Sequence, residues 1–597
     1  MHSVSSLEKA LLLSGANRIH LEQVLKHYSQ STKDTLKLKA ARFLIENMPG
    51  HGWYEGQELN KFKNWIDSVY SNREYPYRAT LYEAYFQQPD AYNGLTYYKD
   101  IEHLDSTFLI NHIDSTFSAI QKRPWLSTLT FEQLCEYIIP YRVGNEPPTL
   151  LYKLQDSIFQ THILPILHFD DIRHNTYHLF SAYQSRYAKR DMKVQIQYQG
   201  KIILYNIASC EAECINQSWH AKLLMCPLAV DLNPAFPNKP NRHCWSVVID
   251  NTQANAVHGL APEVLKQGKI YRRTYTHNPV PVANPKEFIP PLFETPFFKD
   301  VTAFYTTVKD VCIESKDNIK QKYAYLCVFN DLKWEPVAHS EKKNGKFHFK
   351  NMGKGVLYLP VVYDGVNASA ISYPFFIKQT GDLRIFKPDT LTTRSVSLTR
   401  KFPLRNSVEL INKSFLFSKL EASNDPDFNT KEDMAYFTHI SPQQRSLVTI
   451  DNFKTYRYWR ISAPGYLVLG ECSLYNHKGE RVSPVISTVT EKAFDNNPIS
   501  YYQNPKGVFI IDMGNSVSLS RMEVTLRNDG NGVWPGHWYE LNYHNGKEWH
   551  SLGIKAATDY SIPFDNVPDN ALLWLRDLTT GKEESLFSIE NDEIRFW

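Results

Sequence analysis

The feature that most restricts the fold is a change of hydrophobic period at about residue 190. Before it, apolar residues recur at helical spacing. After it, short aromatic-rich runs alternate with polar residues and are separated by turn residues. From about 270 such runs follow one another to the last residue, as at 323–330 and 356–363. This pattern predicts an all-β architecture for roughly 270–597.

The clearest hairpin signal in this half lies at 539–550, where three apolar residues alternate with polar ones. Asn545-Gly546 follows, and this dipeptide favours the two positive φ angles of a type I′ turn. The alternation predicts one apolar and one polar face. We therefore expect residues 405–597 to fold alone as an antiparallel β-sandwich.

The first third of the chain carries helix signals. An amphipathic stripe ends at Pro49-Gly50 and is formed by Leu36, Ala40, Phe43 and Leu44. A second helix is predicted to begin after Thr130 and to end near Pro140, because Thr130 and Gln133 have capping-box spacing.

These patterns predict a multidomain α+β protein with boundaries near 125, 265 and 405. Its expected parts are a helical N-terminal domain (1–125), a mixed core (126–265), a β-sandwich (266–404) and a second β-sandwich (405–597).

The charge balance argues against two classes of protein. Lys and Arg number 66 against 63 Asp and Glu, so the net charge is +3, unlike that of proteins that bind nucleic acid or a membrane surface through basic residues. No apolar run approaches the roughly 18 residues of a membrane-spanning helix. We find no signal peptide and expect either a cytoplasmic chain or the mature form of an exported one. The 8 cysteines, in so long a chain, do not indicate a disulfide scaffold.

Four cysteines fall between 210 and 244, and Cys210 has the most reactive setting. Ser209 suits an N-cap, so the sequence predicts a helix that begins at Cys210. The free N–H groups of a first helical turn favour a thiolate and can hold an oxyanion. His243 follows on a predicted strand. The nucleophile and the base of a thiol-dependent reaction are therefore both present.

Two other interpretations stay open. Cys210 can be a small core residue that never meets His243. The second is a zinc site, although the spacing lacks the paired C-x2-C motifs typical of such sites. Its ligands would come from Cys210, Cys214, His220, Cys226, His243 and Cys244.

Three short motifs in this segment resemble the core of the transglutaminase-like (papain-like cysteine hydrolase) superfamily. They are Ala208-Ser209-Cys210, Met225-Cys226-Pro227 and His243-Cys244-Trp245. Four flanking segments are similar to large, usually exported bacterial members, namely 43–51, 124–146, 269–275 and 526–541. The resemblance implies that Cys210 is a nucleophile, that His243 is its general base, and that the protein is exported to the periplasm or cell surface. Ala208 replaces the family's Gly, and Met225-Cys226 replaces its Gly-Ile pair.

The third catalytic residue is open. The superfamily places an Asp on the strand after the His, and that position falls near His258. Asp250 is the nearest carboxylate, but its odd step from His243 predicts that the two side chains face opposite ways. Asn255 and His258 are the alternatives. Without such an orienting group the site would be degenerate.

Three residues near these motifs are candidates for binding substrate. Arg142 and Glu146 are expected either to line a cleft or to form a salt bridge at a helix end. Trp245, in the His-x-Trp motif, is the third.

The C-terminal part resembles a discoidin-type (galactose-binding-like) jelly roll at 456–460, 493–495, 511–514 and 527–531. The resemblance implies binding of a glycan or another surface ligand through end loops. Trp534 and Trp538 could stack on sugar rings there, although such residues are mostly core in β-sandwiches. Asp529 and Asn531 are candidate calcium ligands, but turns carry these residues without any metal.

Two hypotheses account for these features. The first is a transglutaminase-like cysteine hydrolase or acyl-transferase that acts on peptide or amide bonds of glycoprotein or cell-surface substrates. It needs no cofactor, and its partners are a peptide or glycopeptide. The second is a non-catalytic surface-binding protein in which a degenerate core supports a glycan-binding C-terminal module.

Overall fold

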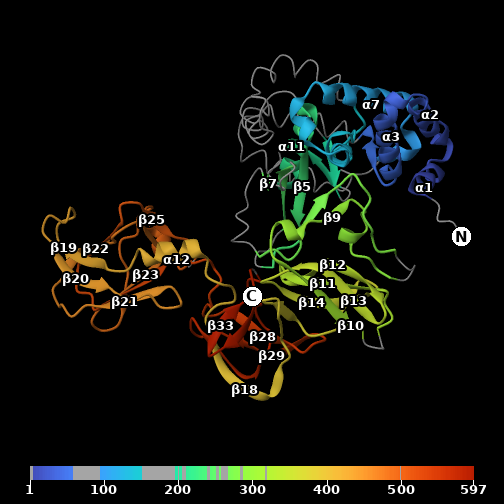
Figure 1. The fold of residues 1–597 in the computed structure, drawn as a ribbon. Helices are drawn as coiled ribbons and strands as arrows, with labels where there is room; N and C mark the ends of the chain where they lie inside the picture. Colours follow the sequence, from blue (N-terminus) through green and yellow to red (C-terminus); the bar gives the residue numbers. More distant parts are fainter. Residues whose placement is uncertain are drawn as a thin grey trace.

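The computed structural model describes residues 5–57, 95–150, 195–198, 201–204, 210–237, 242–249, 255–256, 266–282, 287–315, 319–497, 499–581 and 583–597. The chain is 21% helical and 40% strand, so the expected α+β class is confirmed at that level. Helices gather at the N-terminal end and sheets follow toward the C-terminus (Figure 1). No helix in these ranges is long and apolar enough to cross a membrane.

The N-terminal region is a helical bundle with a small two-stranded sheet. Its elements are α1 Ser6–Leu13, α2 Arg18–Ser29, α3 Thr35–Asn47, β1 Gly52–Glu55, β2 Thr96–Lys99, α6 Asp100–His103 and α7 Ser106–Gln121, with the 3-10 turns η1 Gly15–Asn17 and η2 Thr32–Asp34. The predicted stripe of α3 is confirmed at Ala40 and Leu44, which are buried. Leu36 is 51% exposed, because it lies at the start of the helix beyond the reach of the core.

The bundle's core extends past the expected boundary at 125. Cys135, Ile139, Tyr141 and Tyr275 pack in the same buried cluster as α1, α2, α3 and α7. The Tyr275 hydroxyl hydrogen-bonds to the Tyr141 hydroxyl at 3.2 Å. The helical region and the segment after it therefore share one core.

The predicted capping box at Thr130 is confirmed. The Gln133 N–H donates to Thr130 Oγ1, and the Thr130 N–H donates to Gln133 Oε1. The 3-10 turn η3 Pro124–Thr128 precedes this start. The helix runs through α8 Phe131–Gln133 and a π-helical turn, η4 Leu134–Ile138, and so ends before Pro140 as expected.

A mixed layer follows in which one helix lies on an antiparallel sheet. The helix is α11 Cys210–Leu224, and the sheet order is β7-β6-β5-β8-β9. The strands are β5 Leu228–Asn233, β6 His243–Val248, β7 Asn255–Ala256, β8 Tyr271–Arg273 and β9 Phe298–Asp300, and a separate hairpin joins β3 Gln195–Tyr198 to β4 Lys201–Leu204. The predicted helix from Cys210 and the two strands after it are confirmed.

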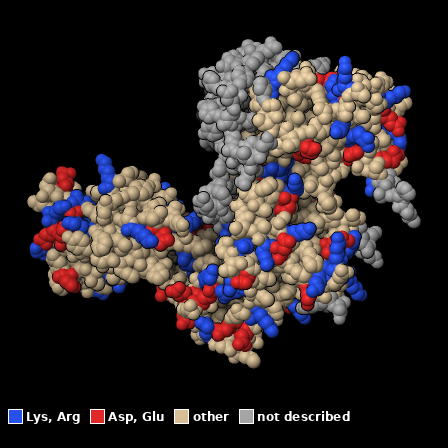
Figure 2. Space-filling view, in the orientation of Figure 1, with Lys and Arg blue, Asp and Glu red and all other residues tan. Residues whose placement is uncertain are grey.

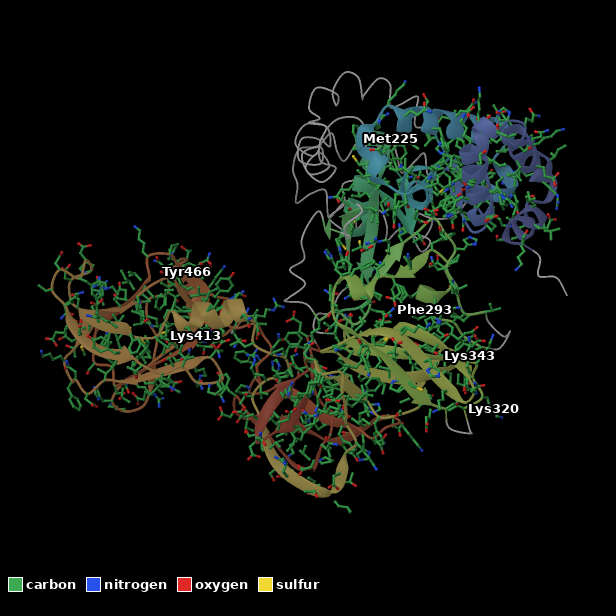
Figure 3. All side chains as sticks on the ribbon, in the orientation of Figure 1. Met225, Phe293, Lys320, Lys343, Lys413 and Tyr466 are labelled. Atoms are coloured by element: carbon green, nitrogen blue, oxygen red, sulfur yellow. The ribbon has the colours of Figure 1, made fainter. Side chains whose placement is uncertain are left out.

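The helix ends where the backbone turns left-handed. Met225, labelled in Figure 3, has a φ of 58° and is buried against Trp125 and Leu228. The Trp125 indole donates to the Met225 carbonyl at 3.2 Å. This C-cap ends α11 two residues before Pro227.

The next layer is an eight-stranded sheet in the order β10-β13-β12-β11-β14-β16-β17, with β15 paired to β14. Its strands are β10 Val308–Glu314, β11 Tyr323–Asn330, β12 Lys333–Lys343, β13 Lys346–Gly353, β14 Leu357–Asp364, β15 Asn367–Ala370, β16 Phe375–Ile377 and β17 Leu383–Ile385, preceded by the 3-10 turns η7 Pro291–Phe293 and η8 Thr302–Phe304. Phe293, labelled in Figure 3, packs with Tyr271 and Tyr325, so the mixed layer and this sheet share a cluster.

Residues 406–527 form a lobe of their own (Figure 1). Two sheets, β20-β19-β22-β26 and β21-β27-β23-β24 with β25 on β23, enclose one core centred on Trp459. The elements are α12 Asn406–Lys413, β19 Ser418–Ser423, β20 Glu432–Phe437, β21 Arg445–Thr449, β22 Tyr456–Ser462, β23 Leu467–Tyr475, β24 Arg481–Val482, the 3-10 turn η9 Glu491–Ala493, β25 Tyr502–Asn504, β26 Val508–Val517 and β27 Arg521–Leu526.

The remaining C-terminal residues build a second core that takes in a strand from before the lobe. Leu398, in β18, packs with Tyr539, Leu575 and Phe587. The sheets are β18-β30 and β29-β28-β31-β32-β33, formed by β18 Asp389–Leu398, β28 Trp538–His544, β29 Trp549–Ala556, β30 Ile562–Asp569, β31 Leu573–Asp577, β32 Leu586–Glu590 and β33 Glu593–Phe596. The segment 405–597 therefore holds two cores, and the second needs residues that precede 405.

The predicted hairpin exists, but its turn differs from the expected type I′. His544 pairs with Trp549, which leaves a four-residue loop. Asn545 Oδ1 accepts the N–H groups of Lys547 and Glu548, each at 2.9 Å, so the side chain closes the loop. Only Gly546 takes a positive φ, and a Cβ there would lie 2.5 Å from the Tyr373 ring.

The expected polar face of this hairpin is covered. Asn542 is 5% and His544 2% exposed, because a neighbouring sheet packs on them. The Trp334 ring lies 6.5 Å from the His544 ring. Both faces of β28 are therefore buried toward its end, at Asn542 and His544, whereas Trp538 at its start is 54% exposed.

We predict that residues 405–527 expressed alone give a β-type circular dichroism spectrum and one cooperative melt, because their core is self-contained. Residues 388–597 are expected to show a second transition that residues 405–597 lack, since removing β18 exposes the edge of β30. A second transition of equal enthalpy in both longer fragments would contradict the role given to β18.

Candidate active site

Two side chains of the predicted pair are brought together at the start of α11 and the start of β6. Cys210 is the first residue of the helix and His243 the first of the strand, and α11 packs on β5 and β6. Cys210 also packs against Cys214 and Cys244. Cys210 and His243 are half-buried, whereas Cys214 and Cys244 are buried. Ser209, the expected N-cap, lies outside the described residues.

The surroundings of Cys210 favour its thiolate. Hydrogen bonds from the Cys244 thiol, the His243 ring and the Cys244 N–H, together with the charge of His243, lower the pKa of Cys210 to about 4, although burial opposes this shift. The same Cys244–Cys210 hydrogen bond, a second one with Cys214 and burial raise the pKa of the Cys244 thiol. Cys210 is therefore ionised at neutral pH while Cys244 stays protonated.

The Cys210–His243 pair opens on a cleft of about 1020 Å³. It is lined by the stretch 136–145 of the helical region, by 290–298, and by residues of α11, β5 and β6. Both signs of charge line it, carried by Glu136, Lys222, Arg242, Arg273 and Glu294. Burial lowers the pKa of Lys222 to about 8, and its Nζ donates to the Pro140 carbonyl at 2.6 Å.

Trp245 does not line the cleft, contrary to the expectation that it binds substrate. It is 4% exposed and packs in a core behind the strand. Its ring stacks beside the His243 ring, with 5.9 Å between centroids and 25° between planes. Residues two apart on a strand share a face, so Trp245 supports the imidazole rather than the substrate.

A buried network of hydrogen bonds fixes the position of the Trp245 ring. The indole N–H donates to the Tyr305 hydroxyl at 3.0 Å, and this hydroxyl donates to Asp231 Oδ2 at 2.6 Å. Arg272 pairs with both oxygens of Asp231, at 2.7 and 2.8 Å. Burial first, and then the charge of Asp231, raise the pKa of Tyr305 and keep it a donor. None of these partners was expected from the sequence, although Arg272 lies inside the family-like segment 269–275.

Arg142 lines the cleft as expected, and its guanidinium and the Glu146 carboxylate are both engaged in bonds within the protein. The Arg142 guanidinium pairs with Asp100 and donates to the Gly52 carbonyl, with 4% of the residue exposed. The Glu146 carboxylate accepts the N–H groups of Val143 and Gly144. The salt bridge therefore fastens this loop to α6 and β1.

The third catalytic residue is not identified among the described residues. Asp250 and His258 lie outside them. The β6–β7 register sets Asn255 opposite Val248, five residues along the strand from His243 and so about 16 Å away. That distance is too long for Asn255 to orient the imidazole.

The C-terminal candidates are dispersed. Trp534 is buried and its N–H donates to the Tyr539 hydroxyl, whereas Trp538 is 54% exposed, so the two do not form a shared stacking surface. Asp529 forms a bidentate pair with Arg400, at 2.8 and 2.6 Å, and the Asn531 amide donates to Glu583. Their polar groups are engaged within the protein and are not arranged for calcium.

The charged side chains of the described surface are mixed in sign on the face that Figure 2 shows. Within the described ranges, no group of three or more His, Cys, Asp or Glu is arranged to hold a metal ion. The zinc ligand set drawn from the sequence includes His220, whose side chain is not described.

No protein-family model matches the chain, and no curated protein matches it.

We predict that Cys210 reacts with limiting iodoacetamide faster than the other cysteines, and that its rate stays near its plateau down to about pH 5. The reason is that hydrogen bonds hold its pKa near 4, so the thiolate is lost only below that pH. Mass spectrometry of labelled peptides at several pH values measures both quantities.

Cys312 is the matched control for this labelling. It is exposed and lies 4.0 Å from a His348 ring nitrogen, but it sits on a strand edge without a helix start. Equal labelling of Cys312 and Cys210 at pH 5 would contradict the effect assigned to the α11 site.

We also predict that Asp231→Ala destabilises the mixed layer by about 3–5 kcal/mol, because it leaves the Arg272 charge buried and unpaired. Glu314→Ala is the control, since its pair with Lys346 is exposed and contributes about 1 kcal/mol or less. Hydrogen-exchange mass spectrometry of β5 and β8 reports the local opening free energy. Protection in Asp231→Ala equal to that in Glu314→Ala would refute the prediction.

Proposed function

We propose that the chain is a cysteine-dependent hydrolase or acyl-transferase of the transglutaminase-like class that acts on peptide or amide bonds. The observation that carries the proposal is the Cys210 thiolate, hydrogen-bonded to His243 and Cys244 and half-exposed on a large cleft. A non-catalytic scaffold would need neither an ionised thiol nor access to it.

The first half-reaction uses these groups directly. The Cys210 sulfur attacks the carbonyl carbon of the amide, and the carbonyl oxygen gains negative charge. A helix start leaves the N–H groups of its first turn without intrahelical partners, and in this proposal those of α11 donate to that oxygen. The His243 imidazolium gives its proton to the leaving amine, and a thioester on Cys210 remains.

The second half-reaction releases the acyl group. His243, now neutral, takes a proton from a water molecule or from a second amine as that group attacks the thioester. Water completes a hydrolysis and an amine completes an acyl transfer; in both cases the Cys210 thiolate and the His243 imidazolium are restored.

The mixed charges of the cleft bear on the substrate. Glu136 and Glu294 line the cleft together with Arg273 of β8, and Arg242 adjoins His243 in the sequence. Such a lining suits an extended peptide with side chains of both signs better than a small anion. Glycoprotein or cell-surface substrates, and export of the chain, remain part of the proposal on the strength of the sequence resemblance.

We expect a thiol-directed activity probe to label the protein at Cys210 and a peptide and glycopeptide panel to include a substrate. Cys210→Ala should reduce both signals to background, because it removes the nucleophile. His243→Ala should lower kcat/KM by about 10²–10⁴-fold, the range for a general acid–base.

Cys312→Ser is the control and should match the parent protein, since Cys312 lies on the far β10 strand. Turnover that survives Cys210→Ala would refute the proposal. So would an acid limb of kcat/KM well above pH 5, because free Cys210 is ionised above about 4.

A further inference from the structure

Three reduced thiols meet beside the candidate nucleophile. Cys210 and Cys214 lie one turn apart on α11, and Cys244 follows His243 on β6. They form one cluster with Val230 and Leu232. Cys210 and Cys244 both line the cleft, and Cys214 does not.

We propose that Cys210 and Cys244 are a peroxide-sensitive pair, in which Cys244 converts an oxidised Cys210 into a reversible disulfide. The proposal rests on the contact between the two thiols and on the access of Cys210 to the cleft, and it holds whether or not the site turns over a substrate.

The chemistry balances with one hydroperoxide. The Cys210 thiolate attacks one peroxide oxygen, the O–O bond breaks, and a sulfenic acid and hydroxide form. The Cys244 thiol then attacks the Cys210 sulfur, its proton joins the departing hydroxyl group as water, and the S–S bond forms. A dithiol reductant returns both residues to thiols.

Cys210 meets the requirements for the oxidised partner. It is half-buried, whereas Cys214 and Cys244 are buried, so a small oxidant reaches it first. The hydrogen bonds that lower its pKa supply the thiolate that peroxide needs.

Cys244 is better placed than Cys214 to resolve the sulfenic acid. Residues four apart on a helix hold their Cβ atoms about 5–6 Å apart. A disulfide needs about 3.5–4.5 Å between Cβ atoms, so a Cys210–Cys214 bond would require unwinding of α11. Cys244 approaches from β6, across the helix–sheet interface, and its thiol already hydrogen-bonds to Cys210.

The disulfide would protect Cys210 from irreversible oxidation and would also block its sulfur reversibly. A sulfenic acid that is not captured goes on to sulfinic and sulfonic acids, which are not restored by thiols. Capture by Cys244 stops the oxidation at a stage that a reductant reverses, while the nucleophile is blocked.

The test is intact-mass and peptide analysis of the full chain after brief exposure to stoichiometric hydrogen peroxide. We expect a loss of about 2 Da, a crosslink between the peptides that carry Cys210 and Cys244, and full recovery with dithiothreitol. Because these readouts need no substrate, they separate this inference from the proposed catalytic function.

Variants sharpen the test. Cys244→Ala should instead gain about 16 Da at Cys210 with one equivalent of peroxide and about 32 Da with two or more, and dithiothreitol should not remove the 32 Da adduct. Cys214→Ala and Cys312→Ser should still form the Cys210–Cys244 crosslink. The inference fails if the parent protein gains oxygen without crosslinking, or if the crosslink joins Cys210 to Cys214. The parent protein alone decides this even if a variant does not fold.

Discussion

The ion pair between Asp231 and Arg272 supports the rest of the candidate site. Both side chains are buried, and two charges in such a place are tolerated only when their hydrogen bonds are satisfied. The Tyr305 hydroxyl supplies a further donor to Asp231, and through it Trp245 is tied to the same carboxylate. Because Trp245 stacks beside His243, a network remote from the cleft restricts the imidazole. Hydrogen bonding between Arg272 and Tyr137 extends the network into the helical region.

The cleft exists because distant segments of the chain share cores. His51 stacks between Tyr275 and Phe297, with ring centroids 4.3 and 4.0 Å away. The Glu136 carboxylate accepts the Tyr275 N–H and the Thr276 hydroxyl. The helical region and the segment after β8 are thereby held together, and residues of both line the cleft. The cleft is therefore a property of this assembly and not of α11 and β6 alone.

Local signals in the sequence identified the elements well, whereas tertiary context decided their roles. The capping box at Thr130 and the helix start at Cys210 depend on neighbours within a few residues, so they could be predicted. Trp245 has the same local pattern whether it faces substrate or core, and only the position of Tyr305 settles that question. Local sequence likewise could not predict that residues 406–527 form a separate lobe inserted into the last β-domain. The reason is that β18 pairs with β30, which follows the lobe in the chain.

The low pKa of the Cys210 thiol bears on which step of the proposed reaction it would favour. Lowering the pKa from about 8.5 to about 4 raises the thiolate fraction at neutral pH by about 30-fold, but intrinsic nucleophilicity falls with a Brønsted coefficient of about 0.4–0.5, or about 100-fold. The two effects are of similar size, so the hydrogen bonds from Cys244 and His243 do little for attack itself. In the proposed reaction they favour the departure steps, because an acidic thiol is a better leaving group from its thioester and His243 is placed to protonate the departing amine. The first of the donors that give Cys210 this character is Cys244, the same thiol that we propose to capture an oxidised Cys210; the stabilisation of the thiolate and its proposed sensitivity to oxidation therefore have one structural origin.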